Sequence, residues 1–155
     1  MLVFRLGSSR YPANDGRGAS LYGGRWNHKG TAVIYTAGSI ALCALEVMAN
    51  ADEIGSDYVI TTIEIPDETE ITRIGVDDLP VGWDAGEAVS ATRDIGTQWA
   101  CNLSAPVLQV PSAVVPREFN FILNPAHSKF SGFHFSLPEP FYFDDRLRRG
   151  WRVKR

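Results

Sequence analysis

Cysteine is scarce in this chain of 155 residues: there are two, Cys43 and Cys101, both set among apolar neighbours. This excludes a secreted scaffold held together by disulfides and indicates a reducing compartment, so we expect a cytoplasmic protein. No apolar run approaches the ~20 residues that a membrane-spanning helix needs. The first residues also lack the three-part layout of a signal peptide. We therefore expect no association with membranes.

Charge is also low, at 21% of residues, while 45% are apolar, which excludes a disordered chain and fits one globular domain. The net charge of −3 conceals an uneven distribution, because six of the 15 basic residues lie in the last ten positions. The first 145 residues carry 9 basic and 18 acidic groups. Such a body would repel a phosphate backbone, so we expect no direct nucleic-acid binding.

The pattern of elements predicts an α+β fold with mainly antiparallel sheet and two principal helices. Polar, glycine-rich residues 1–30 are predicted to be mostly ordered loop after an opening strand, and residues 66–86 to be acidic loop with short extended pieces. The predicted helices are Ile40–Asn50, with Ser39 as its N-cap, and Glu87–Asn102. The predicted strands are Leu2–Leu6, Ala32–Thr36, Asp57–Ile65, Pro106–Val110, Phe119–Leu123 and Phe133–Phe135, with a further extended piece at Pro138–Phe143.

Glu46 stands on a helix that is apolar around nearly its whole circumference, so we expect that helix to be buried. A carboxylate there is costly to desolvate unless it is paired or faces a polar cleft. Two interpretations remain open: a structural ion pair, or a catalytic carboxylate held by a rigid helix.

A second candidate region combines glycines, arginines and aromatic residues in the stretch Tyr22-Gly23-Gly24-Arg25-Trp26-Asn27. Glycines let backbone N–H groups approach an anion, and the guanidinium of Arg25 matches the geometry of a pyrophosphate. Neither a Walker loop nor a Rossmann fingerprint is present, and glycine-rich stretches are often only turns. Tyr35 could stack on a flat heterocycle or simply pack in the core.

The sequence supports neither a metal site nor a serine hydrolase. His28, His127 and His134 are scattered, so we expect no metal. Ser112 lies outside any Gly-x-Ser-x-Gly elbow, which leaves it a role in orienting a substrate or a carboxylate. Asn120 is a polar group among apolar strand residues, for which a turn or cap is the default role.

Taken together and in order, these segments resemble the RES domain, the toxin half of bacterial RES–Xre toxin–antitoxin pairs. The resemblance rests on Arg5, Gly24-Arg25-Trp26-Asn27-x-x-Gly30, Val33-Ile34-Tyr35-Thr36, Ala44-Leu45-Glu46-Val47, Val110-Pro111-Ser112 and Asn120-x-x-x-Asn124-Pro125-x-His127. It predicts a RES domain at residues 3–147 and leaves residues 148–155 as a basic C-terminal extension.

The resemblance implies a fold related to ADP-ribosyltransferases and a toxin that depletes NAD by cleaving its nicotinamide–ribose bond, through hydrolysis or phosphorolysis. NAD would be a substrate, with no further cofactor. Glu46, Arg25, Tyr35 and Ser112 would be catalytic, and Arg5, Arg25, Tyr35 and Asn120 would bind the dinucleotide. An Xre-like antitoxin would cover the cleft, and association into homo-oligomers stays open. Two alternatives are a transferase that ADP-ribosylates a protein and a non-catalytic domain that senses NAD or binds a partner.

Overall fold

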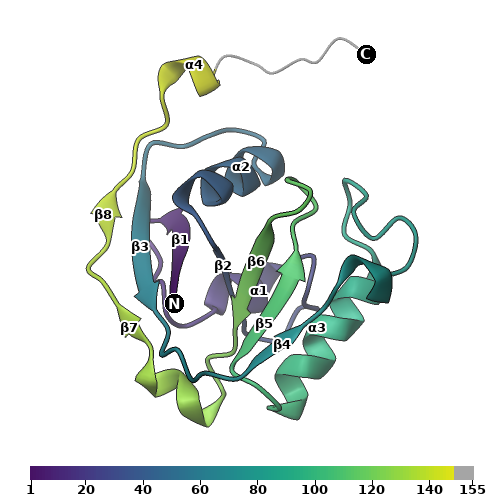
Figure 1. The fold of residues 1–155 in the computed structure, drawn as a ribbon. Coiled ribbons are helices and arrows are strands. Elements are labelled where there is room, and N and C mark those ends of the chain that lie inside the picture. Colours follow the sequence, from purple (N-terminus) through teal and green to yellow (C-terminus); the bar gives the residue numbers. More distant parts are fainter. Residues whose placement is uncertain (149–155) are drawn as a thin grey trace.

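Eight β-strands form one sheet, in the order β4-β5-β6-β2-β1-β3-β7, with β8 paired to β3 (Figure 1). The computed structural model describes residues 1–148. The strands are β1 (Leu2–Ser8), β2 (Ile34–Ala37), β3 (Tyr58–Glu64), β4 (Ile71–Arg73), β5 (Val107–Pro111), β6 (Phe119–Leu123), β7 (His134–Phe135) and β8 (Glu139–Pro140). Every pairing is antiparallel except that of β4 with β5, which confirms the predicted α+β class with mainly antiparallel sheet.

The helices are α1 (Arg17–Tyr22), α2 (Ile40–Asn50), α3 (Ser90–Asn102) and α4 (Asp145–Arg148), with 3-10 turns at Val76–Asp78 and Ser128–Gly132. The predicted cap of α2 is confirmed, because Ser39 Oγ accepts a hydrogen bond from the backbone N–H of Leu42. α2 packs against β1 and β2 (Figure 1). No helix within residues 1–148 is long and apolar enough to cross a membrane.

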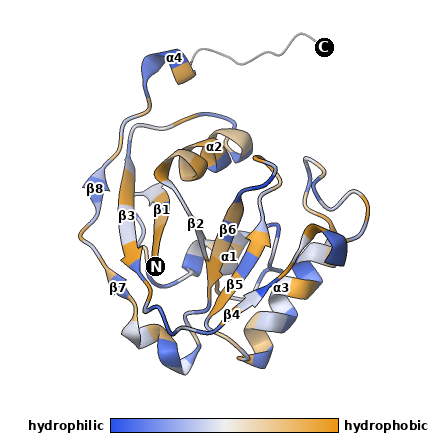
Figure 2. Cartoon of the chain, viewed as in Figure 1, coloured by the Kyte–Doolittle hydropathy of each residue, from blue (hydrophilic) through white to orange (hydrophobic). Residues whose placement is uncertain are grey.

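The buried apolar residues form three clusters, and half of their members lie on the strands, which are largely hydrophobic in Figure 2. One cluster joins Trp99 of α3 to β5, β6 and Trp26. A second lies around Ile63 and Leu123, and the third joins Leu42 and Cys43 of α2 to Leu6 of β1. The third cluster fixes α2 over the strands and so fixes the direction in which Glu46 points.

The helices differ from expectation at α1 and α2. α1 interrupts residues 1–30, which were expected to be mostly loop; its N-cap is Gly16 in the left-handed region, with no side-chain cap to reveal it in the sequence. α2 is not buried all round, because Ile40 is 39% and Leu45 is 43% exposed. The predicted basic extension at 148–155 lies outside the described residues from Arg149 onward.

Candidate active site

A cleft runs between α2 and the neighbouring strands and consists of two adjoining hollows of about 240 and 420 Å³. We call it the Glu46 cleft. Five residues line both hollows: Arg5 of β1, Tyr35 of β2, Glu46 and Asn50 of α2, and Asn120 of β6. Four of the six residues proposed from the sequence therefore meet here, although 115 positions separate the first from the last.

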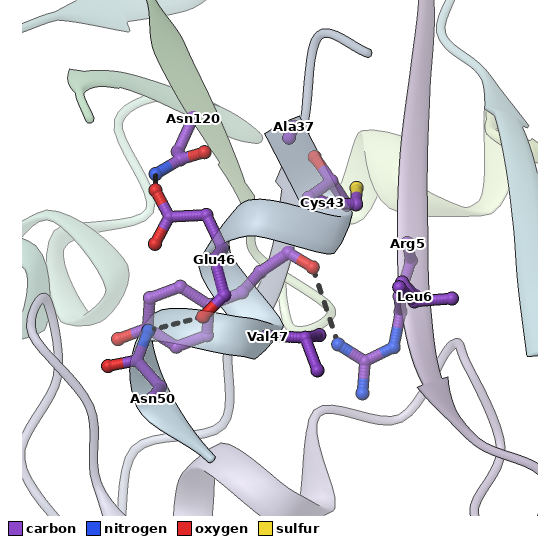
Figure 3. A pocket seen from close by; sticks show the side chains of 10 residues that line it. Arg5, Leu6, Ala37, Cys43, Glu46, Val47, Asn50 and Asn120 are labelled. Atoms are coloured by element: carbon purple, nitrogen blue, oxygen red, sulfur yellow. Dashed lines mark hydrogen bonds between the residues drawn. The ribbon is translucent and has the colours of Figure 1, made fainter. Parts of the chain in front are cut away.

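Glu46 is half-buried and receives two hydrogen bonds on a single carboxylate oxygen. Asn120 Nδ2 donates to Oε1 over 2.6 Å (Figure 3), and Ser112 Oγ donates to the same atom over 2.8 Å. Hydrogen bonds to a charged acceptor compensate part of its desolvation and fix its rotamer. Both hydrogen bonds end on Oε1, so Glu46 Oε2 takes part in neither. Within residues 1–148 the side-chain partners of the Glu46 carboxylate are neutral, and no ion pair of the kind given by the alternative interpretation involves it.

Ser112 is held in place by the turn at residues 112–118, which joins β5 to β6. Its Oγ accepts hydrogen bonds from the backbone N–H groups of Val114 and Val115, at 3.1 and 2.9 Å. Its own N–H donates to the carbonyl of Glu118. The side chain is 3% exposed, so it acts on the cleft through Glu46.

Asn120 leaves one polar atom without a partner among the described residues. Its Nδ2 is bonded to Glu46, while its Oδ1 is buried and accepts no hydrogen bond. Buried acceptors without a partner are rare and mark places where a ligand or water completes the bonding. Because Asn120 lines both hollows, its amide belongs to the cleft.

Tyr35 is fixed at its hydroxyl. The hydroxyl donates to Asn27 Oδ1 over 2.6 Å and accepts from the N–H of Trp26 over 3.0 Å. Burial raises the pKa of Tyr35 far above its usual value of 10.0, so the phenol is neutral. Gly24 is required beside it, because a Cβ there would stand 2.5 Å from the hydroxyl oxygen. The hydroxyl is thus structural, and Tyr35 lines both hollows.

Arg5 is a half-buried cation that lines both hollows of the cleft. Its Nη1 donates to the carbonyl of Tyr35 over 3.3 Å (Figure 3), and burial lowers the pKa of its guanidinium below the usual value. A guanidinium has five donors, so one such bond leaves most of its capacity for an anion.

Arg25 lines only the larger hollow and is bonded to a distant loop. Its Nη1 donates to the carbonyl of Trp83 and its Nη2 to that of Ala85, both over 2.7 Å. These partners lie about sixty residues away, and no sequence pattern near Arg25 points to them. Arg25 therefore connects the glycine-rich loop to the loop at 83–85. A phosphate would bind to the N–H groups of Arg25 that these two hydrogen bonds leave free.

Two residues that the sequence reasoning did not assign support the site from outside. Asn27 is fully buried, and its Nδ2 donates to the carbonyls of Ala19, His28 and Thr31, which fixes the loop around Arg25. Arg93 of α3 donates through Nε to the carbonyl of Gly24 over 3.2 Å. Asn27 stood within the stretch already singled out, whereas nothing near Arg93 in the sequence points to this loop.

Comparison with known proteins gives consistent results. The sequence profile of the RES domain matches residues 2–144. "Toxin Res" of Yersinia enterocolitica is 40% identical over 153 residues, covering 96% of this chain and all of that protein. The "Prs ADP-ribosylating toxin" of a Sphingobium species is 38% identical over 147 residues, covering 90% of each chain.

A solved structure has a similar fold. It is the toxin–antitoxin complex MbcT–MbcA of M. tuberculosis, matched with a TM-score of 0.71 over 90% of this chain and 83% of that chain. The sequence identity is 20%, so this likeness concerns the fold.

Proposed function

Because this chain belongs to the RES domain family, we propose that it is the toxin of a toxin–antitoxin pair and that it consumes NAD by breaking the nicotinamide–ribose bond. The observation that carries the proposal is the carboxylate of Glu46, oriented on one oxygen by Ser112 and Asn120 inside a cleft that also holds two arginines. The relatives named as toxins support the first half of the proposal.

The reaction requires a fixed negative charge. As the bond from ribose to nicotinamide breaks, the sugar becomes an oxocarbenium ion and nicotinamide leaves as a neutral molecule. A preorganised carboxylate stabilises that positive charge without reorganising at the moment of reaction. Glu46 fills this role through Oε2, while Oε1 stays bonded to its two neutral donors.

The remaining residues bind and position the dinucleotide. Arg5 and Arg25 are the cations that face the cleft, and they bind the pyrophosphate. The ring of Tyr35 stacks against nicotinamide. The unpartnered Oδ1 of Asn120 accepts a hydrogen bond from substrate, for which a ribose hydroxyl or the carboxamide N–H₂ is suited.

The acceptor of the ADP-ribosyl group is either water, phosphate or a protein side chain. Water or phosphate gives net loss of NAD, which is our preferred reaction. Transfer to a protein is the second candidate, and the Sphingobium relative named as an ADP-ribosylating toxin favours it. In both cases the bond that breaks and the role of Glu46 are the same.

We further propose that the partner is an Xre-like antitoxin that covers the cleft. The similar solved structure is a toxin–antitoxin complex, which supports a protein partner for this fold. A cover over the cleft would silence the enzyme without altering any catalytic residue.

The test is incubation of the purified chain with NAD alone, with NAD plus phosphate, and with NAD plus a cell extract. Release of nicotinamide without any protein acceptor supports the preferred reaction, and acceleration by phosphate identifies phosphorolysis. Nicotinamide release that requires the extract and labels a protein supports the transferase. No release under any of the three conditions contradicts the proposal.

A further inference from the structure

We infer that the Glu46 cleft continues past Arg5 into a second pocket, and that this pocket takes the adenosine end of the dinucleotide. We call it the Tyr11 pocket; it is about 440 Å³ in volume. The inference rests on the proposed function, because it takes NAD as the ligand. It adds the binding site of the adenosine half of NAD, which does not react.

The Tyr11 pocket is built from segments that the catalytic residues do not use. The loop 9–14, which follows β1, forms one side, and Val59 and Thr61 of β3 with Phe135 of β7 form the other. Its size falls within the ~300–1,000 Å³ range of small-molecule sites.

A narrow hollow of about 70 Å³ joins the two cavities. It shares Arg5 and Gly18 with the Glu46 cleft. It shares Tyr11, Ala13 and Thr61 with the Tyr11 pocket. Arg5 and Thr61 are also paired neighbours on β1 and β3, so the three spaces follow one another along the same part of the sheet.

The walls of the Tyr11 pocket suit a flat, neutral and partly apolar group. Tyr11 and Phe135 supply aromatic surface, and Pro12 and Pro138 supply aliphatic surface. The charge of Arg10 is already paired, because its Nε lies 3.2 Å from Asp57 Oδ2. A purine ring is stabilised by stacking on such surface.

The order of charges along the path matches a dinucleotide. The neutral Tyr11 pocket comes first, the half-buried cation Arg5 follows at the junction, and the carboxylate of Glu46 comes last. This is the order adenosine, pyrophosphate and the ribose that becomes cationic. A mononucleotide that carries nicotinamide but no adenosine would fill only the second half of this path.

The loop that covers the Tyr11 pocket is held in place without a ligand. The N–H of Ser9 donates to the carbonyl of Asp57 over 2.7 Å, and Ser8 Oγ donates to the Asp57 carboxylate over 2.6 Å. The Asp57 carboxylate thus joins the start of the loop to the strand beneath it, so the pocket is formed before ligand binds.

The experiment compares NAD with nicotinamide mononucleotide as substrates of Ala13→Trp, which fills the passage and the pocket. The matched control is Ala126→Trp, since Ala126 is exposed and lines none of the described cavities. We expect Ala13→Trp to raise KM for NAD at least tenfold and to leave cleavage of the mononucleotide unchanged, with the control like the parent chain. Equal effects on both substrates, or no effect on NAD, would overturn the inference.

Titration calorimetry with ADP separates this inference from the proposed cleavage, because it needs no turnover. We expect ADP to bind the parent chain, to bind at least tenfold more weakly to Ala13→Trp, and to bind several-fold more weakly to Tyr11→Ala, which keeps the loop but removes the exposed ring. Should the parent chain fail to cleave NAD while ADP binds in this way, the proposed reaction fails and the pocket stands. Absence of ADP binding, or binding that neither variant weakens, contradicts the pocket.

Discussion

Ser112 Oγ donates a hydrogen bond to Glu46 Oε1 over 2.8 Å. Ser112 Oγ itself accepts hydrogen bonds from the backbone N–H groups of Val114 and Val115. A hydroxyl has one proton and two lone pairs. With both lone pairs taken by the turn, the proton has one direction left, toward Glu46. The β5–β6 turn thus aims a hydrogen bond at a carboxylate on α2.

Ser112→Ala removes this hydrogen bond and leaves two backbone N–H groups of the turn without their acceptor. We expect kcat for NAD cleavage to fall about 10- to 100-fold, since a hydrogen bond to a charged group contributes about 1.5–3 kcal/mol. We also expect the free energy of unfolding to fall by about 1–3 kcal/mol. Steady-state kinetics and urea unfolding measure the two effects. Full kcat in a folded Ser112→Ala protein would show that Glu46 needs no such orientation.

Arg25→Lys keeps the charge but cannot bridge the carbonyls of Trp83 and Ala85, because one ammonium replaces a planar two-pronged group. We expect a raised KM for NAD and faster amide hydrogen exchange in the loop at 83–85. Arg17→Lys is the control, because Arg17 is exposed and lines none of the described cavities. Faster exchange with unchanged KM would assign Arg25 a structural role alone.

Gly96 lies where α3 crosses the backbone of Trp26, and an added Cβ would collide with the Trp26 carbonyl. We expect Gly96→Ala to lower the free energy of unfolding by about 2–3 kcal/mol, despite the better helix propensity of alanine. Gly132→Ala is the control, since a Cβ there meets nothing within 4 Å. Thermal unfolding compares the two variants. Equal stability of both would contradict the close packing of α3 on this loop.

Burial raises the pKa of the Cys43 thiol from 9.0 to about 11. The folded state holds this proton more tightly than the unfolded chain, so its contribution to stability is complete below about pH 9 and is lost as pH rises toward 11. The difference in pKa corresponds to about 2–3 kcal/mol. We expect Cys43→Ala to lose less stability than the parent chain between pH 8 and 11, and Cys101→Ala to behave like the parent. An equal loss of stability with pH in all three proteins would contradict the raised pKa of Cys43.

The sequence predicted well what depends on neighbouring residues. α2 has the predicted bounds, because its helix-forming residues and the Ser39 cap act locally. Phe119–Leu123 is also a strand with the predicted bounds. Glu46 could be singled out because a carboxylate on an apolar helix is costly wherever that helix packs.

What depended on distant contacts could not be predicted. Glycine lowers helix propensity, so Gly96 alone predicts a weaker α3, whereas in the fold it is the point where α3 contacts Trp26. The exposure of Leu45 depends on which faces of α2 the sheet covers, and an all-apolar helix carries no sign of that. The resemblance, rather than residue spacing, brought Asn120 into the site, because its partner Glu46 lies 74 positions away.

The most direct test of the account is the rate of nicotinamide release from NAD by Glu46→Gln, measured beside Glu53→Gln. Glu53 is exposed and lines none of the described cavities, so its substitution controls for loss of a charge near α2. We predict that Glu46→Gln folds like the parent chain and releases nicotinamide about 10²–10³-fold more slowly, because a neutral amide cannot stabilise the cationic ribose. Glu53→Gln should keep the parent rate. A folded Glu46→Gln protein that cleaves NAD at the parent rate would contradict the central role of this carboxylate.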